Sequence, residues 1–337
     1  MRLEAVPRQH PLHRRWFVRD GLADPREYEL CCRFTGLVIE ADFTLSQGGI
    51  GWRAQNKLPA MTKSFANSDV LAFYRELPFN YRESADKHAQ VIRDSDAIAS
   101  SYPVLAPLLR RGGAVLDVGC GAGWFSLSAA YHYGSVVTGI DFNDVAISRA
   151  RDVAHALGIG VQFHTADLFQ FQPTELFDLV VSIGVLHHTD NCLAGVRRLF
   201  NAFVKPGGHV FIGLYHVGGR RPFLEHFRRM RAAGSSEQDM LIEYKRLHPL
   251  ADETHLRSWF RDQVLHPHET QHKLAEMLPI LDETGMILVS TSINRFAPIE
   301  DISALLQAEM RLEQLAVDRL AEGRYFPGFF VFLARKG

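Results

Sequence analysis

The sequence predicts an α/β protein in which helices cover a parallel β-sheet. From residue 114 onward, short apolar segments typical of strands alternate with helix-forming segments of ten or more residues. Such alternation produces parallel strands joined by right-handed crossovers. Glycines directly after the first of these strands mark a sharp turn into a helix, where the backbone can approach a ligand closely.

Five strands are expected before residue 217. They cover residues 114–118, 136–140, 161–165, 177–183 and 209–215. Helices with apolar residues at helical spacing separate them, at 124–133, 144–157 and 192–204. The alternation stops over the polar, His-rich residues 217–272, then resumes with a helix at 273–283, a strand at 286–293, a helix at 302–322 and a strand at 329–334.

The chain before this pattern is expected to form an N-terminal cap or accessory region. We place the cap at residues 1–100 and the main domain at residues 101–337, judged from where the alternation begins. Within the cap the sequence predicts two short strands about a turn and then two helices, at 37–45, 50–52, 68–76 and 85–100.

Composition excludes several classes of protein. Of 337 residues, 47% are apolar and 22% are charged, which is typical of a globular domain and not of a disordered chain. Lys and Arg number 37 against 38 Asp and Glu, so no global field attracts nucleic acid or an anionic membrane. Four cysteines without a C-x-x-C pair argue against a disulfide scaffold or a zinc ribbon. With no apolar signal segment and no long apolar run, we expect a cytoplasmic protein.

The strongest motif is Val115-Leu-Asp-Val-Gly-Cys-Gly-Ala-Gly-Trp-Phe125. A dinucleotide fingerprint needs its third glycine where Trp124 stands, and a P-loop needs G-K-[ST], which this segment lacks. The pattern is instead D-x-G-x-G-x-G, with an acid inside the strand.

This segment resembles motif I of the class I S-adenosylmethionine (SAM)-dependent methyltransferases. Further blocks resemble the family in its order and spacing over about residues 110–216, namely Gly139-Ile-Asp141, Ala166-Asp-Leu168, Phe177-Asp-Leu-Val-Val-Ser-Ile-Gly-Val-Leu-His187 and Lys205-Pro-Gly-Gly208. The resemblance implies a doubly wound, mostly parallel seven-stranded sheet with a helical, lid-like insert at 217–272 between the fifth and sixth strands. It also implies SAM as cofactor and S-adenosyl-L-homocysteine as product.

The resemblance also assigns cofactor-binding residues. Asp141 would accept the ribose hydroxyls, Asp167 and Leu168 would meet the adenine, and Asp117 would support the loop. The remaining candidates surround the expected cofactor: Tyr81, Gly119, Cys120, Gly121, Gly123, Phe142 and Gly184. Phe142 is equally compatible with a core position, and Cys120 is most simply a small loop residue.

Base candidates follow the fourth and fifth strands, where a doubly wound sheet places its ligands. They are His187, His188, Tyr215 and His216. Methyl transfer needs an aligned nucleophile, exclusion of water and, for some acceptors, removal of a proton. The alternative is that His187 packs against the cofactor and His188 caps the next helix.

The most unusual stretch is residues 254–272, within the insert. We expect Trp259, Arg261, His266 and His272 to bind the acceptor, or to form lid hydrogen bonds over it. His266-x-His268-x3-His272 has workable metal-ligand spacing, but no cysteine assists and Pro267 disfavours a helical presentation, so no metal is expected.

The sequence therefore predicts a methyltransferase that acts on a small-molecule acceptor, a metabolite or natural-product intermediate. The main rival is an RNA (tRNA) methyltransferase, against which stand the neutral charge and the lack of a recognisable RNA-binding module. A SAM-binding protein without catalysis is the third interpretation. Whether N, O, S or C is methylated, and whether the chain forms a homodimer, stay open.

Overall fold

The structure is a computed structural model that describes residues 67–337, all of which belong to the compact unit Leu58–Gly337. The strands predicted at 37–45 and 50–52 lie outside the described residues. The boundary predicted at residue 100 stays a prediction, and the described helices before it belong to the same compact unit as the sheet.

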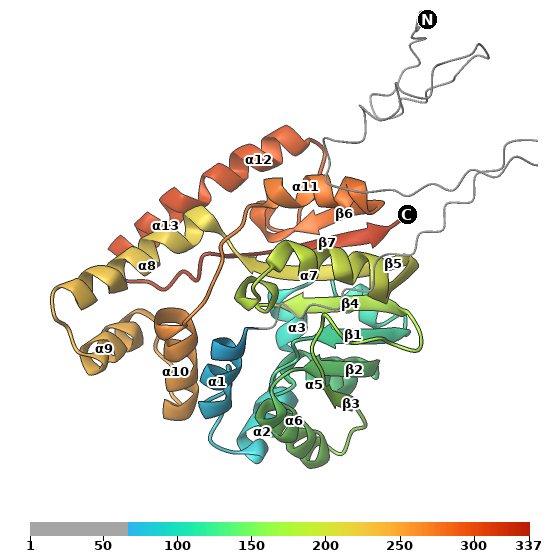
Figure 1. The fold of residues 1–337 in the computed structure, drawn as a ribbon, viewed down its shortest axis with the longest axis horizontal. Coiled ribbons are helices and arrows are strands. Elements are labelled where there is room, and N and C mark those ends of the chain that lie inside the picture. Colours follow the sequence, from blue (N-terminus) through green and yellow to red (C-terminus); the bar gives the residue numbers. More distant parts are fainter. Residues whose placement is uncertain (1–66) are drawn as a thin grey trace, which may run out of the picture. The chain divides into compact units, whose positions relative to one another are not determined.

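One seven-stranded sheet forms the centre of this unit, in the order β3-β2-β1-β4-β5-β7-β6 (Figure 1). Its strands are β1 Ala114–Val118, β2 Val136–Asp141, β3 Gln162–Thr165, β4 Phe177–Ile183, β5 Val204–Tyr215, β6 Met286–Thr291 and β7 Phe329–Lys336. The first five run parallel, and β7 pairs antiparallel with both β5 and β6. The predicted doubly wound, mostly parallel sheet is confirmed.

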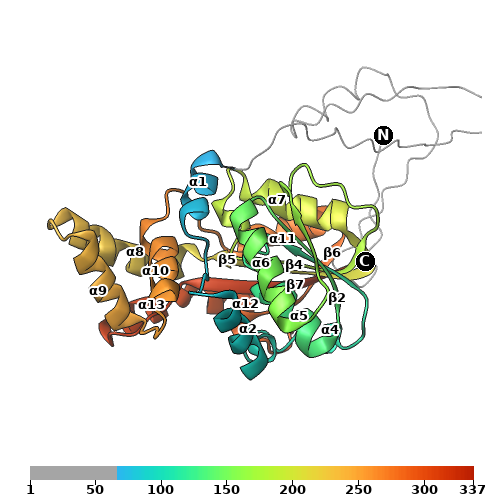
Figure 2. The same cartoon turned by 90° about the horizontal axis from the view of Figure 1, so that it is seen from below.

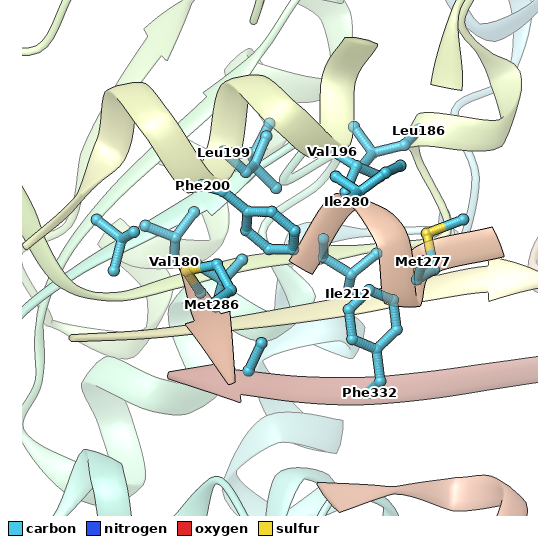
Figure 3. Packing of buried hydrophobic residues seen from close by; sticks show 14 of the residues in the cluster. Val180, Leu186, Val196, Leu199, Phe200, Ile212, Met277, Ile280, Met286 and Phe332 are labelled. Atoms are coloured by element: carbon cyan, nitrogen blue, oxygen red, sulfur yellow. The ribbon is translucent and has the colours of Figure 1, made fainter. Parts of the chain in front are cut away.

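Helices cover both faces because successive side chains of a strand point to opposite sides. In β4, the Val180 side chain packs in one cluster with α7 (Cys192–Arg198) and α11 (Leu274–Glu283). Leu179 and Val181 pack on the other face, in a cluster with α4 (Ala106–Leu109) and α5 (Trp124–Tyr133). Figure 3 shows the first cluster, in which Phe200 and Ile280 pack over Ile212. The helices concerned are α2 Ala85–Asp94, α3 Ala97–Ser101, α4 Ala106–Leu109, α5 Trp124–Tyr133, α6 Asp144–Leu157, α7 Cys192–Arg198 and α11 Leu274–Glu283.

Two predicted helices are interrupted in the structure. The helix expected at 85–100 breaks before α3, because the Asp96 side chain accepts a hydrogen bond from the Ala99 amide and caps a new helix. The helix expected at 302–322 divides at Arg311 into α12 Ile302–Met310 and α13 Leu312–Ala321. Element existence was therefore predicted better than element continuity.

The insert between β5 and β6 is helical. It contains α8 Val217–Ala232, α9 Glu237–Leu247, α10 Glu253–Phe260 and a π-helical turn, Arg261–Leu265. Its own apolar cluster includes Phe223, Phe227 and Tyr244. Helix α1, Ser68–Glu76, lies beside α10 in both views (Figures 1 and 2). Among the described residues, none of the helices combines the length and apolar character needed to cross a membrane.

Candidate functional site

A cavity of about 560 Å³ lies at the carboxyl ends of the central strands. Strand order reverses between β1 and β4, which is where doubly wound sheets bind ligands. Residues from the ends of β1, β2, β4 and β5 line the cavity together with α1, the segment 78–82 and the insert. The cavity therefore joins two groups of polar residues, one on the glycine loop and one on the insert.

The glycine loop forms one wall of the cavity. Gly121 has a φ of +52°, and a Cβ atom placed there would meet no atom within 4 Å. Because Gly121 also lines the cavity, this free space is part of it. The Gly121 amide donates to Asp141 Oδ2 at 2.9 Å, and the Asn143 amide donates to Asp141 Oδ1 at 2.8 Å. Burial raises the pKa of Asp141 to about 6.

Asp117 lies deeper in the same wall, with only 4% of its surface exposed. Its Oδ2 accepts a hydrogen bond from the Ser126 hydroxyl at 2.6 Å. Burial raises the pKa of Asp117 to about 7 from the ordinary 3.8. This carboxyl group thus joins β1 to the first turns of α5, and it is ionised only at the expense of stability.

We expect Asp117→Asn to stabilise the ligand-free protein at pH 8. Between about pH 4 and 7 the folded state keeps a proton that the unfolded state releases, so stability falls as the pH rises through this window. The variant removes that loss and should raise the free energy of unfolding by about 1–3 kcal/mol at pH 8. Urea unfolding at pH 4 and pH 8 measures the effect. A difference from wild type that is equal at both pH values would contradict this explanation.

Most of the other predicted cofactor residues also line the cavity. These are Gly119, Cys120, Phe142, Asp167, Leu168 and Gly184. Gly123 and Tyr81 do not. Gly123 is the N-cap that precedes α5, with a φ of +85°, and a Cβ there would meet the side chain of Leu127. The ring of Tyr81 instead lies 4.1 Å from the guanidinium of Arg149.

The opposite end of the cavity, which we call the polar end, is lined by Tyr74, His188, Tyr215, Asp262 and Gln263. The Tyr74 hydroxyl donates to Asp262 Oδ1 at 2.5 Å, and the Tyr215 hydroxyl donates to Asp262 Oδ2 at 3.1 Å. Gln263 Nε2 donates to Asp262 Oδ2 at 2.6 Å and to the Tyr215 hydroxyl at 2.5 Å. Asp262 therefore organises the polar end.

Only two of the four predicted base candidates line the cavity, His188 and Tyr215. His187 is completely buried, and its Nδ1 accepts a hydrogen bond from the Tyr215 amide at 3.3 Å. His216 caps α8 through a bond from the Gly219 amide at 3.0 Å, with Nε2 3.4 Å from Glu309. His187 and His216 thus hold the strand ends and do not line the cavity.

The four acceptor candidates of the insert are also divided. Trp259 lines the cavity and donates to Asn80 at 3.2 Å. The other three lie outside the lining. Arg261 donates to Glu76 of α1 at 2.7 Å. The ring of His266 lies 3.8 Å from the ring of His188. His272 pairs with Glu276 at 3.0 Å.

The stretch 254–272 is nevertheless fixed against both strand ends. The Thr270 amide donates to the His187 carbonyl and the His272 amide donates to the Tyr215 carbonyl, each at 2.8 Å. His266, His268 and His272 do not converge, because His268 Nε2 lies 3.2 Å from the Thr189 carbonyl. Backbone hydrogen bonds thus fix the insert at the carboxyl ends of β4 and β5.

Arg220 of α8 is completely buried next to the polar end, where it contacts Gln263 and Tyr215. Its guanidinium bonds both oxygens of Glu269 at 3.1 and 2.8 Å and lies 4.1 Å from the Tyr215 ring. It also donates to the side-chain and backbone oxygens of Gln263 at 3.1 and 2.7 Å.

We expect Arg220→Ala to lower the free energy of unfolding by about 3 kcal/mol, because it leaves the Glu269 side chain, only 11% exposed, without its partner. Arg197→Ala is the matched control. The Arg197–Glu283 pair has a similar length, 3.0 Å, but its side chains are 40% and 55% exposed. That control should cost less than about 1 kcal/mol. Equal losses in the two variants, measured by urea unfolding, would refute the structural role of Arg220.

Sequence reasoning missed Tyr74, Asp262 and Gln263 as members of the site. Asp262 and Gln263 lie within residues 254–272, whose unusual composition predicted a functional segment. The composition did not indicate which positions in that segment would line the site. Tyr74 had no signal, because a single aromatic residue in a predicted helix is more often a core residue.

Comparisons with known proteins agree with this geometry. Residues 115–208 match the family model described as a methyltransferase domain. The ubiquinone biosynthesis O-methyltransferase of Vibrio vulnificus (strain YJ016) is 31% identical over 158 residues, which cover 43% of this chain and 64% of that protein. The enzyme of the same name from Shewanella pealeana is 32% identical over 154 residues, with the same coverage. The matched part thus spans slightly less than two thirds of these relatives.

Solved structures are similar at lower identity. PKMT2 from Rickettsia typhi in complex with AdoHcy aligns with a TM-score of 0.48 and 19% identity, covering 68% of this chain and 49% of that one. The magnesium protoporphyrin IX methyltransferase from Synechocystis PCC 6803 with bound SAH has a TM-score of 0.42 and 18% identity, with coverages of 74% and 83%. The family match, the sheet order and the acid at the end of β2 agree. Residues 115–208 therefore match a methyltransferase domain, and the seven-stranded sheet around them has the strand order of a class I methyltransferase fold.

Proposed function

We propose that this protein transfers the methyl group of SAM to a hydroxyl oxygen of a small molecule. The observation that carries the proposal is the continuous cavity. It connects the wall formed by the glycine loop and Asp141 to the polar end around His188 and Asp262. The O-methyltransferase names of the curated relatives support oxygen as the methylated atom.

The residues of the cavity fit the cofactor. The free space above Gly121 suits a ligand that passes close to the backbone, and the Asp141 carboxylate lies beside it to accept ribose hydroxyls. Asp167 and Leu168 lie in the same cavity for the adenine. When bound, SAM would supply a methyl carbon activated by its positively charged sulfur; in-line attack by the acceptor oxygen on that carbon would form the O–CH3 bond and break the S–CH3 bond, with S-adenosyl-L-homocysteine as leaving group.

His188 is the base in this proposal. Its Nδ1 lies 3.0 Å from the His268 carbonyl, and because a carbonyl only accepts, Nδ1 carries the proton and Nε2 is left as an acceptor. Burial lowers the pKa of His188, so the ring is neutral near pH 7 and can take the proton of an acceptor hydroxyl. Tyr215 and Tyr74, both bonded to Asp262, would orient the acceptor.

We expect Asp141→Ala to weaken SAM binding by about 1.5–3 kcal/mol, the range for hydrogen bonds to a charged group. Wild-type affinity should also fall as the pH drops below about 6, where Asp141 gains a proton. Isothermal titration calorimetry measures both effects. Asp152→Ala, an exposed acid on α6, is the control and should bind SAM like the wild type. Unchanged affinity in Asp141→Ala would remove this residue from the site.

A label-transfer experiment tests the proposed reaction. The protein and [methyl-³H]SAM are incubated with separated low-molecular-weight, RNA and protein fractions of a cell extract. We expect label in the low-molecular-weight fraction, at an oxygen identified by mass spectrometry. Label in tRNA would favour the RNA methyltransferase alternative. SAM binding without transfer to any fraction would favour a SAM-binding protein without catalysis. The cytoplasmic location and a homodimer stay predictions.

A further inference from the structure

Three potential metal ligands meet at the polar end. One ligand atom each from His188, Asp262 and His266 lies within 4.8 Å of the other two. His188 and Asp262 are 5% and 3% exposed, and both line the cavity. The cluster therefore combines two imidazoles and one carboxylate at a place that a small molecule in the cavity can reach.

His188 already has the orientation of a metal-binding histidine. Its Nδ1–H donates to the His268 carbonyl, which leaves the Nε2 lone pair 3.9 Å from Asp262 Oδ1. Metal-ligating histidines usually hold their second ring nitrogen in this way. Two acceptors separated by this distance do not bond each other, whereas a cation between them would satisfy both.

Asp262 lacks a strong cationic partner. Both its oxygens accept hydrogen bonds, but the donors are the neutral side chains of Tyr74, Tyr215 and Gln263. In the described part of the chain, the one potentially cationic side chain within 4 Å of the Asp262 carboxylate is His188, whose Nε2 lies 3.9 Å from Oδ1. The nearby guanidinium of Arg220 is bonded to Glu269. A buried carboxylate without a counter-charge is costly, so a cation at this position would stabilise it.

His266 completes the cluster. Among the described residues, its buried Nε2 has no hydrogen-bond partner. Its Nδ1 accepts from the His268 amide at 3.1 Å, which places the ring proton on Nε2. Ligation through Nε2 would move that proton to Nδ1 and break this hydrogen bond. Ion binding should therefore shift the backbone of residues 266–268.

We propose that His188, Asp262 and His266 bind one divalent ion of the first transition row, such as Mn²⁺, Fe²⁺, Co²⁺ or Zn²⁺. Two imidazoles with one carboxylate suit these ions, whereas Mg²⁺ prefers oxygen ligands alone. The proposal replaces the expectation of no metal drawn from the sequence. The role of the ion rests on the proposed function and replaces the base: with Nε2 of His188 bound to the ion, His188 would be a ligand, and an open coordination position facing the cavity would take the acceptor hydroxyl and lower its pKa.

Titration with Co²⁺ tests the site without any acceptor. The full-length, tag-free protein is treated with a chelator, dialysed and titrated by calorimetry while its visible absorption is recorded. We expect one equivalent of Co²⁺ with ligand-field bands in the visible region, and Mg²⁺ binding weaker by at least about a hundredfold. Asp262→Asn and His266→Ala should each weaken Co²⁺ binding by at least about a hundredfold.

The control is His226→Ala, which removes the half-buried His226–Glu243 pair, a competing two-ligand site with a 2.9 Å contact. Its Co²⁺ affinity should match the wild type. Circular dichroism checks folding, and His266→Gln replaces His266→Ala if the latter is unfolded. No stoichiometric Co²⁺ binding in the wild type would overturn the proposal, as would unchanged binding in both cluster variants. SAM binding by the chelator-treated protein is measured in parallel, so failure of the metal site is distinguishable from failure of the proposed function.

Discussion

Gly121→Val is expected to weaken SAM binding by at least about a hundredfold. The side chain would project into the free space of the cavity beside Asp141, where the cofactor passes the backbone. The φ of +52° adds backbone strain, because side chains with a branched Cβ rarely adopt positive φ. Calorimetric titration with SAM measures the effect.

A matched glycine separates blocked binding from lost stability. Gly158 caps α6 with a φ of +70°, and a Cβ atom added there would also meet no atom within 4 Å, but Gly158 does not line the cavity. Gly158→Val should therefore lose stability in a similar way and keep its SAM affinity. If Gly121→Val also bound SAM with wild-type affinity, the cofactor would not pass this loop.

His188→Ala is expected to slow methyl transfer by about a hundredfold to ten-thousandfold, the range for loss of a general base. SAM affinity should stay within about twofold, because the change is at the polar end. In the wild type the rate should fall as the pH drops through the lowered pKa of His188, since the protonated ring cannot accept a proton. In the His188→Ala variant, the rate should not show this fall at low pH, that is, its pH–rate profile should lack the acid limb. Rates are measured with the acceptor identified by label transfer, on chelator-treated protein in which Nε2 of His188 is free.

His155→Ala, on an exposed face of α6, is the control and should retain full activity. A wild-type rate in His188→Ala would exclude the base role. A lower rate with an unchanged acid limb would instead indicate that His188 positions the acceptor and that another group takes the proton.

The fold and the wall of the cavity formed by the glycine loop and Asp141 could be predicted because their signals are local. The glycine loop and the acid that ends β2 are contiguous motifs, and they lie together in the cavity as expected. Strand and helix periodicity depends on neighbouring residues only, so the alternation was confirmed. Breaks such as the one before α3 depend on a single capping side chain, Asp96, which competes with helix continuation.

The polar end was predictable only as a region, because it depends on tertiary packing. Tyr74 of α1 and Asp262 of the insert are 188 positions apart and meet only when both elements pack on the strand ends. Adjacent residues in the sequence can also have side chains in different environments. His188 lines the cavity, whereas His187 is buried behind it. Arg261, expected to bind the acceptor or to form lid hydrogen bonds, donates to Glu76 and so joins the insert to α1.

A crystal structure with S-adenosylhomocysteine bound is the most direct test of the central claim, that one cavity holds the cofactor and presents its sulfur to the polar end. The account predicts the ribose hydroxyls on the Asp141 carboxylate, the adenine beside Asp167 and the sulfur facing the end lined by His188 and Tyr215. A ribose bound away from Asp141, or a sulfur directed away from His188 and Tyr215, would contradict it.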